Sequence, residues 1–212
     1  MNNDLINIKA IFLDLDGTIY LGEELIDGAL EFLERCTQKG IRRFFLSNNS
    51  SRSVDEYLSK LRGLNIPAEK EDILLSTHDL LSWLANKEIT ETYLVGTEGM
   101  RSMLEEAGVN TQSEKPQYVV LGYDTEINYS KLSIAAKHLH RGISLVASHL
   151  DIVCPSPDGD LPDVGAYLAL FEATTGVSPI HICGKPNPSM LSHKIKDLRL
   201  KNNEVGMVGD SI

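Results

Sequence analysis

The chain has 212 residues, of which 42% are hydrophobic and 24% charged, as in an ordinary soluble globular protein with a substantial core. Its formal net charge of −10 disfavours nucleic acid as a partner, because binding to a phosphate backbone depends on clustered lysine and arginine. Its three cysteines form no Cys-x-x-Cys pair, and no run approaches the ~20 apolar residues of a membrane span, so we expect a cytoplasmic protein without a disulfide framework.

The first informative stretch is an apolar run from Ile11 to Leu13, typical of a buried parallel strand, which ends in Asp-Gly-Thr turn chemistry. This strand delivers Asp14 and Asp16 to its C-terminal edge, on the same side because strand residues alternate. Two acids directed at one point repel each other, and a hard cation such as Mg²⁺ would neutralise them. The carboxyl ends of the strands are also where open α/β sheets bind ligands. The alternatives are a solvated Asp-Gly turn and a calcium loop, although an EF-hand needs glycine in sixth position and Gly17 is fourth.

The segment from Lys9 to Thr18, which contains both acids, resembles the first motif of the haloacid dehalogenase-like (HAD) hydrolases. In that family the first aspartate is the nucleophile that attacks phosphorus, and the second is a general acid and base. The resemblance therefore implies these roles for Asp14 and Asp16. The partner motifs of the family are then expected further along the chain.

A second strand is predicted from Ile41 to Leu46, after a helix from Gly28 to Lys39. The connection from Ile19 to Ile26 is either a flap beside the site or a plain solvated link. A strand, a helix and a strand in this order predict a parallel sheet. The second strand ends in Ser47-Asn48-Asn49-Ser50, whose hydroxyl and amide groups can hold phosphoryl oxygens, although such a run alone indicates a turn. Its position resembles the second HAD motif, with Ser47 as the hydroxyl that contacts phosphate.

A second α/β unit is predicted inside the first. Ser53 and Glu56 form a capping box for a helix that Gly63 ends, and from about Thr77 helices and strands alternate again before the family motifs resume. The helices of this inserted unit are expected from Thr77 or Asp79 through Leu84, at Met100–Ala107 and at Ser130–Arg141, and its strands at Thr92–Val95, Tyr118–Leu121 and Ile143–Ala147.

Three segments of the inserted unit, 119–124, 147–151 and 163–166, are similar to the large C2-type cap of the subgroup IIA HAD phosphatases. That subgroup includes para-nitrophenylphosphatase-like, phosphoglycolate phosphatase-like and nucleotide phosphatase-like enzymes. The resemblance implies that His149 and Asp151 face the substrate. His149 stands where asparagine is common, and it is either a substrate contact, a pH-sensitive group or a structural residue.

The core is expected to resume with a strand from Ile180 to Cys183, followed by Gly184-Lys185-Pro186-Asn187-Pro188. Two prolines so close to a glycine exclude regular structure, which predicts a rigid turn for Lys185 at a strand end. An ammonium there would offset charge between Asp14 and a phosphate. The segment resembles the third HAD motif.

A helix from Ser189 to Leu198 and a strand from Val205 to Val208 are predicted next, and the strand runs into Asp210. Asp210 is a third carboxylate at a strand end and resembles the acidic fourth motif, which completes the Mg²⁺ site. Subgroup members normally continue with a further acid, strand and helix. We therefore expect the sequence ending at Ile212 to be a C-terminally incomplete form.

Together the four motifs imply a Rossmann-like three-layer α/β core with a parallel sheet, formed by residues 1–76 and 180–212, and an inserted C2-type α/β cap at residues 77–179. The implied catalytic residues are Asp14, Asp16 and Lys185; the implied phosphate- and substrate-binding residues are Gly17, Ser47, Asn48, Asn49, His149, Asp151 and Lys185; and the implied metal ligands are Asp14, Asp210 and the main-chain carbonyl of Asp16.

The implied activity is Mg²⁺-dependent hydrolysis of a small phosphomonoester through an aspartyl-phosphate. A sugar phosphate, phosphoglycolate, a nucleotide and p-nitrophenyl phosphate all fit this substrate class. No nucleic acid or membrane partner is expected, and a homodimer is left open. A non-catalytic HAD-like phosphate-binding protein or an inactive fragment is the alternative. A receiver-type phospho-acceptor is a third, which would not need the inserted cap.

Overall fold

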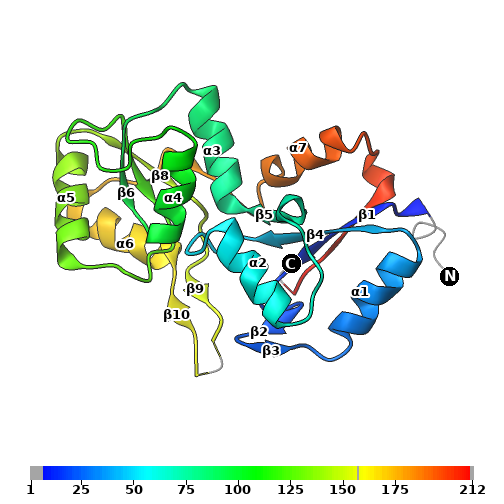
Figure 1. Ribbon diagram of the computed structural model, residues 1–212. Coiled ribbons are helices and arrows are strands. Elements are labelled where there is room, and N and C mark those ends of the chain that lie inside the picture. The colour runs from blue at the N-terminus through cyan, green and yellow to red at the C-terminus, as the bar shows by residue number, and fades with distance from the viewer. Residues whose placement is uncertain (1–6, 157, 211–212) are drawn as a thin grey trace.

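The computed structural model describes residues 7–156 and 158–210. Two four-stranded parallel sheets organise the molecule, one in each half (Figure 1). The strands of the first sheet, in spatial order, are β12 (Val205–Val208), β1 (Ala10–Asp14), β4 (Arg42–Ser47) and β5 (Ile73–Leu75). Those of the second are β11 (His181–Ile182), β8 (Ser144–Ala147), β7 (Tyr118–Leu121) and β6 (Thr92–Val95).

The first sheet is the middle layer of a three-layer unit, the core. Because side chains alternate along a strand, Leu13 and Phe45 pack on one face and Phe12 and Phe44 on the other. The first face is covered by α1 (Ala29–Gln38) and α2 (Val54–Gly63), and the second by α7 (Ser189–Asp197). Two short 3₁₀ turns, η2 (Lys70–Asp72) and η3 (Asn202–Glu204), lead into strands β5 and β12.

The second sheet is likewise covered on both faces, and its unit is called the cap below. Helices α3 (Ser76–Asn86) and α4 (Glu98–Glu106) lie on one face, and α5 (Tyr129–His140) and α6 (Val164–Thr175) on the other. Strands β6, β7 and β8 are almost entirely buried, as expected for parallel strands between two helical layers, and the edge strand β11 is partly buried. The predicted α/β class and Rossmann-like core with an inserted α/β unit are confirmed.

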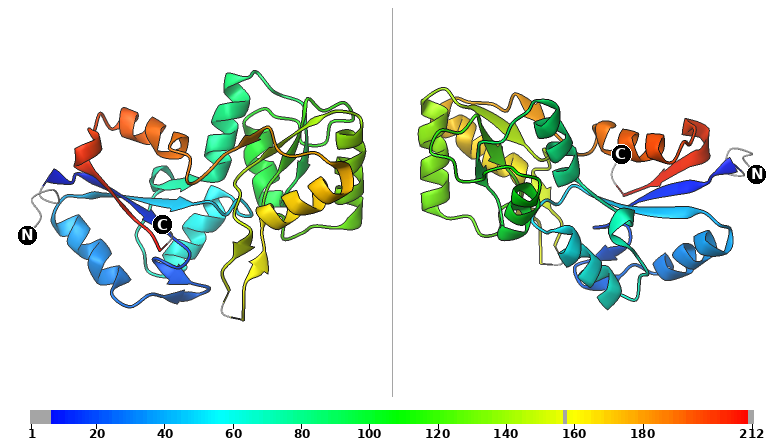
Figure 2. Two further views of the ribbon diagram at one scale, coloured as in Figure 1. Left: turned by 180° about the vertical axis from the view of Figure 1, so that it is seen from behind. Right: turned by 45° about the horizontal axis from the view of Figure 1, so that its top comes forward.

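Two antiparallel hairpins flank the space between core and cap. One consists of β2 (Tyr20–Leu21) and β3 (Glu24–Leu25), within the stretch that the sequence left open as a flap or a link. The other consists of β9 (Val153–Cys154) and β10 (Leu161–Pro162), and it extends from the cap alongside the first hairpin in all views (Figures 1 and 2).

One boundary differs from the sequence prediction. The strand expected to resume the core, residues 180–183, is β11, and it pairs in parallel with β8 of the cap sheet. The chain therefore returns to the core only in the segment between Ile182 and Ser189 (Figure 1). A local sequence pattern indicates a strand but not its partner, because pairing is decided by the rest of the fold. Within residues 7–156 and 158–210, no helix has the length and apolar character that crossing a membrane requires.

Candidate active site

The carboxyl ends of β1, β4 and β12 lie side by side at one edge of the core sheet. Leu13 of β1 is level with Val208 of β12, and Asp14 is level with Leu46 of β4. Asp14 and Ser47, the last residues of β1 and β4, are therefore brought to the same edge as Asp210, which lies two residues beyond the end of β12. The structure thus assembles the segments that the sequence placed at strand ends.

Asp14 is held in a fixed orientation at this edge, with 8% of its surface exposed. Its Oδ1 accepts a hydrogen bond from Leu15 N at 2.8 Å, and its Oδ2 lies 2.6 Å from Lys185 Nζ. The ammonium neutralises the carboxylate without covering both oxygens. The carboxylate group is thus held in one orientation, which is what a nucleophile needs.

Asp210 lies next to the turn that follows Asp14. Gly17 has φ +82°, and a Cβ built on it would be 2.6 Å from Asp210 Oδ2. A Cβ on Gly209 would be 3.7 Å from Asp14 Oδ2, so the ends of β1 and β12 approach closely. Any larger residue at position 17 would clash with the acid. Two carboxylates at adjoining strand ends are hard oxygen donors of the kind that suits Mg²⁺.

Asp16, two residues after Asp14, has a pKa shifted by its surroundings. Burial, which is the largest cause, and the nearby charge of Asp14 raise its pKa, while Lys60 opposes the shift. Gly17 N donates to Tyr20 O at 2.8 Å and fixes the turn that carries Asp16. A carboxyl group that keeps its proton to higher pH is suited to general acid catalysis.

The Ser47-Asn48-Asn49 segment forms a loop with internal order. Ser47 Oγ lies 3.0 Å from the hydroxyl of Tyr57 and accepts from Asn49 N at 3.1 Å. Tyr57 was not predicted to take part. Its hydroxyl is fully buried, burial raises its pKa, and it therefore stays neutral and holds Ser47 at the strand end.

Lys185 lies on the turn that leads from the cap back to the core. Its main-chain N donates to Asn48 Oδ1 at 2.7 Å. Gly184 has φ +75°, and a Cβ there would be 2.6 Å from the same Asn48 oxygen, so only glycine allows this approach. Asn48, predicted as a phosphate contact, therefore uses its side chain to hold the lysine loop.

Asp79 is a further residue of this loop system that sequence reasoning missed. It was expected as a helix cap, but α3 begins earlier, at Ser76. The Asp79 carboxylate is buried, and its Oδ2 accepts from Gly184 N at 2.9 Å and from Ser189 Oγ at 2.8 Å. It ties the two ends of the lysine loop to α3. No local signal could reveal this, because its partners lie more than a hundred positions along the chain.

Replacing Asp79 by alanine is expected to lower the free energy of unfolding by about 1–3 kcal/mol, because a buried main-chain N–H loses its acceptor. Urea titration of both proteins measures the difference. Ser189→Ala is the matched control, since it removes one donor and leaves the Gly184 bond intact, and we expect a smaller loss. Equal stability of the Asp79 variant and the parent would mean that the loop is held by its other contacts.

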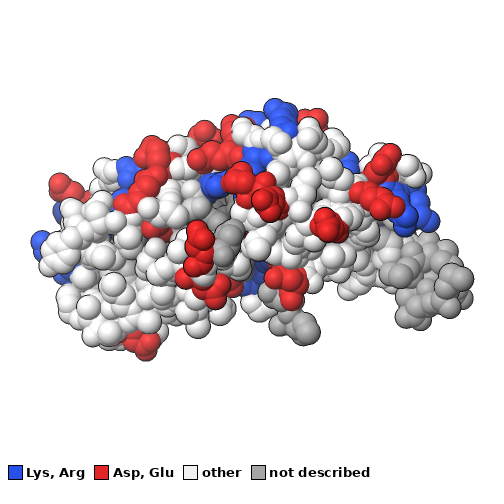
Figure 3. All heavy atoms as spheres, turned by 90° about the horizontal axis from the view of Figure 1, so that it is seen from below, with Lys and Arg blue, Asp and Glu red and all other residues white. Residues whose placement is uncertain are grey.

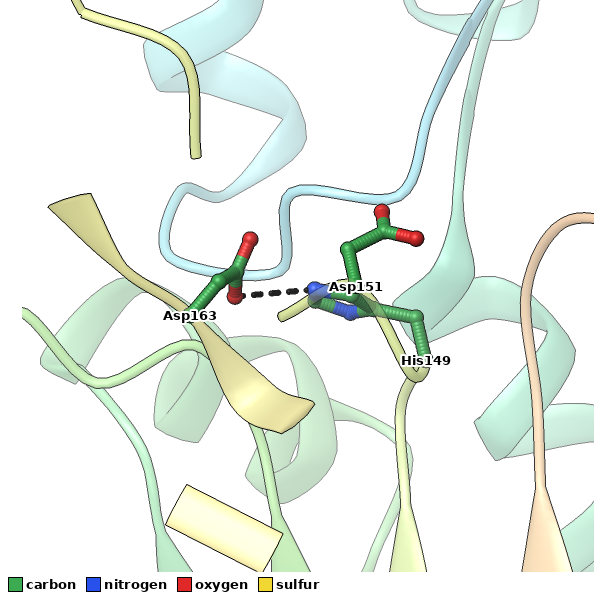
Figure 4. Close-up of side chains that lie close together, drawn as sticks. All are labelled: His149, Asp151 and Asp163. Carbon is green, nitrogen blue, oxygen red and sulfur yellow. Dashed lines mark hydrogen bonds and ion pairs between the residues drawn. The ribbon is translucent and has the colours of Figure 1, made fainter. Parts of the chain in front are cut away.

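His149 does not face a substrate, and the prediction that it does is wrong. Its side chain is 0% exposed; Nδ1 lies 3.0 Å from Ser148 Oγ, and Nε2 lies 3.0 Å from Asp163 Oδ1 (Figure 4). Asp163 also caps α6 through Val164 N. Both ring nitrogens have buried partners, so His149 is a structural residue of the cap.

His149, Asp151 and Asp163 also gather closely enough to be considered as metal ligands. One ligand atom from each comes within 4.8 Å of the others in the described chain. Their hydrogen bonds account for this arrangement, however. Asp163 holds His149, whereas the Asp151 carboxylate points away from that pair, as Figure 4 shows, and its Oδ2 accepts from Asn48 Nδ2 at 2.9 Å.

A cavity of about 190 Å³ lies between core and cap, beside Asp16. Its core side includes Lys60, whose Nζ lies 3.9 Å from the centre of the Tyr20 ring. The Tyr20 hydroxyl is buried without a hydrogen-bond partner among the described residues. The full lining is Asp16, Tyr20, Gly22, Glu23, Asn49, Ser51, Arg52, Tyr57 and Lys60 from the core, and Tyr123, Thr125, Cys154 and Pro155 from the cap. Both hairpins contribute, so the two units line the cavity together.

Comparison with known proteins gives a family-model match over part of the chain and similar proteins over nearly all of it. A family model described as haloacid dehalogenase-like hydrolase matches residues 11–110. An acid sugar phosphatase of Staphylococcus aureus (strain MRSA252) is 35% identical over 204 residues, which cover 95% of this chain and 78% of the relative.

Solved structures agree with the sequence matches. A 4-nitrophenylphosphatase from Thermotoga maritima has a TM-score of 0.93 and 34% identity, and the match covers 99% of this chain and 80% of that one. A glycerol phosphate phosphatase from Mycobacterium tuberculosis, solved in complex with magnesium, has a TM-score of 0.86 and 28% identity, with 96% of this chain and 62% of that one covered.

Proposed function

Because the chain belongs to the haloacid dehalogenase-like hydrolases, we propose that it hydrolyses small phosphomonoesters with the help of Mg²⁺, through an aspartyl-phosphate formed on Asp14. The observation that carries this proposal is the 2.6 Å contact between Asp14 Oδ2 and Lys185 Nζ at a strand edge that Asp210 also reaches. A carboxylate fixed beside a lysine and a second carboxylate is suited to attack on a phosphate held there.

In the first step an Asp14 carboxylate oxygen attacks phosphorus in line with the ester bond. The bond from phosphorus to the ester oxygen breaks, and Asp16 gives its proton to that oxygen, so that a neutral alcohol leaves. In the second step Asp16, now a carboxylate, takes a proton from a water molecule whose oxygen attacks the same phosphorus. Inorganic phosphate leaves and Asp14 is restored. The raised pKa of Asp16 supports its role as the proton carrier.

The remaining groups position the phosphate. Lys185 Nζ, Ser47 Oγ and the main chain around Asn49 would hold its equatorial oxygens, and such positioning supplies most of the catalysis in phosphoryl transfer. Mg²⁺, held by Asp14, Asp210 and the carbonyl of Asp16, would offset the charge that builds up on these oxygens. The fit rests on the hard carboxylate oxygens of Asp14 and Asp210, which lie at the adjoining ends of β1 and β12.

The cavity beside Asp16 would take the alcohol part of the substrate. Its volume of about 190 Å³ suits a small molecule, and its lining mixes charged, hydroxyl and aromatic groups. The names of the relatives, which are phosphatases of sugars, glycerol phosphate and 4-nitrophenyl phosphate, support this substrate class. On the face shown in Figure 3, acidic side chains are interspersed with basic ones and leave no continuous basic surface, which supports a small-molecule substrate over nucleic acid. We also propose a cytoplasmic location, which the three free cysteines support.

The direct test is turnover of a panel of phosphomonoesters with and without Mg²⁺. Hydrolysis that depends on Mg²⁺ supports the proposal. Binding of inorganic phosphate without turnover of any ester would instead favour a non-catalytic phosphate-binding protein.

Replacing Asp210 by asparagine is expected to raise the Mg²⁺ concentration for half-maximal activity by at least about tenfold, because even outer-shell partners of a metal are worth about 10- to 100-fold in affinity. Titration of activity with Mg²⁺ measures the shift. Asp197→Asn, on the exposed side of α7, is the matched control for loss of one negative charge in the core. A Mg²⁺ titration of the Asp210 variant that overlays the parent would remove this residue from the metal site.

A further inference from the structure

The Asn48 side chain joins the cap, the lysine loop and the core. Its Nδ2 donates to Asp151 Oδ2 of the cap at 2.9 Å and to Lys185 O at 3.2 Å, and its Oδ1 accepts from Lys185 N at 2.7 Å. All three partners agree with a single orientation of the amide, because the nitrogen meets two acceptors and the oxygen meets a donor. The main-chain oxygen of Asn48 accepts from Ser76 Oγ at 2.6 Å, which ties the residue to the start of α3 as well.

Lys185 is placed where its position depends on such a bridge. It lies three residues after β11, the edge strand of the cap sheet, and four before α7 of the core. Its main chain therefore belongs to neither sheet, although its ammonium must lie against Asp14. The amide of Asn48 fixes the lysine main chain at both its N–H and its C=O.

Asp151 acts on this amide from the cap. It is partly buried, and its Oδ2 accepts from the same Nδ2 that reaches Lys185 O. It does not line the cavity beside Asp16. Its side-chain partner in the structure is therefore Asn48, next to the lysine loop.

The loop that carries Asn48 is also where the cap docks. Ser50 Oγ lies 2.9 Å from Ser148 Oγ and accepts from Tyr123 N at 2.8 Å. Thr97 Oγ1 donates to Ser51 O at 2.7 Å. These contacts hold the cap on the loop. The contact between Asp151 and Asn48 differs from them because the same Asn48 amide also bonds the main chain of Lys185.

We propose that Asp151 is a positioning residue for the phosphoryl-transfer chemistry, which acts through the Asn48 amide to place Lys185 against Asp14 only while the cap is docked. The inference rests on the proposed function, since it concerns a lysine that holds phosphate. Asp151, a residue of the cap, would thus help to build the phosphate site of the core. The cap would then complete this site as well as cover it.

The test compares Asp151→Ala, which removes the acceptor, with Asp151→Asn, whose amide oxygen can still accept from Asn48. For Asp151→Ala we expect kcat/KM to fall about tenfold, the effect of one lost hydrogen bond to a charged group. The factor should be the same for p-nitrophenyl phosphate and glycerol phosphate, and affinity for inorganic phosphate, measured by calorimetry, should fall with it. Asp151→Asn should retain most of the parent's kcat/KM and most of its affinity for inorganic phosphate. Asp160→Ala, an exposed acid between β9 and β10, controls for loss of charge from the cap and should match the parent.

The same substitution in a protein that lacks the Lys185 ammonium tests whether Asp151 acts through that lysine. In Lys185→Met protein, Asp151→Ala should change phosphate affinity by less than about twofold, because the group that Asp151 positions is gone. Asp151→Ser, which is also too short to reach Asn48, replaces the alanine variant if that one does not fold.

Two results would overturn the inference. In the first, Asp151→Ala lowers kcat/KM by different factors for the two esters and leaves phosphate affinity unchanged, which would make Asp151 a leaving-group contact. In the second, Asp151→Ala lowers phosphate affinity equally with and without Lys185. A parent protein that binds phosphate but turns over no ester would refute the proposed function instead, and the calorimetric comparison would still decide the role of Asp151.

Discussion

Replacing Asp14 by asparagine is expected to lower turnover by at least about 10⁴-fold, as removal of a covalent nucleophile does in other hydrolases. The amide keeps the shape of the carboxylate but is not a nucleophile, and it gives Lys185 no charge to pair with. Its oxygen can still accept the hydrogen bond that Leu15 N now donates to Asp14 Oδ1, so the end of β1 should stay folded.

Steady-state turnover of p-nitrophenyl phosphate and a thermal melt together measure these two effects. Glu24→Gln on the exposed β2–β3 hairpin removes one charge near the site and should leave both unchanged. Acid-quenched parent protein should carry a phosphate adduct during turnover, and the variant should carry none. Turnover of the variant within tenfold of the parent would exclude the covalent mechanism.

Replacing Asp16 by asparagine is expected to slow the chemical steps by roughly 10²- to 10⁴-fold, the usual contribution of general acid and base catalysis. The loss should be larger for glycerol phosphate than for p-nitrophenyl phosphate, because a nitrophenolate leaves without a proton and an alkoxide does not. Mg²⁺ titration should change little, since the proposed ligand at this position is a main-chain carbonyl.

Single-turnover rates at saturating Mg²⁺ separate the chemical steps from metal binding. If the Asp16 variant lost Mg²⁺ affinity while its single-turnover rate stayed normal, the proton-carrier role would belong to another group. Equal losses for the two esters would mean that Asp16 assists the second step alone.

The sequence predicted most strands because their signal is local. Apolar runs mark β1, β4 and β7, and their position between helices predicts parallel sheets. Strand β5 was missed because it has three residues directly between a 3₁₀ turn and a helix. Strand β11 was assigned to the wrong sheet, since a two-residue strand carries no information about its partner.

For the site, too, residues with a local sequence signal were predictable, and residues whose role depends on distant contacts were not. Asp14, Lys185 and Asp210 were predicted to converge because residues that end parallel strands share an edge. The task of Asn48 was not predictable, because its partners are 103 and 137 positions away and depend on how two units pack. His149 was misassigned for a related reason: Asp163, which occupies its Nε2, follows 14 residues later across a hairpin whose path the sequence does not define.

The docking contacts at Ser50 and Asn48 bear on how such proteins diversify. If specificity changed by recombination of whole caps, a segment exchanged between relatives at residues 76–183 would separate Ser148 and Asp151 from Ser50 and Asn48, their partners outside the segment. A chimaera made that way takes its cap from one parent and the core loop that holds the cap from the other. The heritable unit is therefore discontinuous in the gene: it comprises the cap together with the short core loop from Ser47 to Arg52.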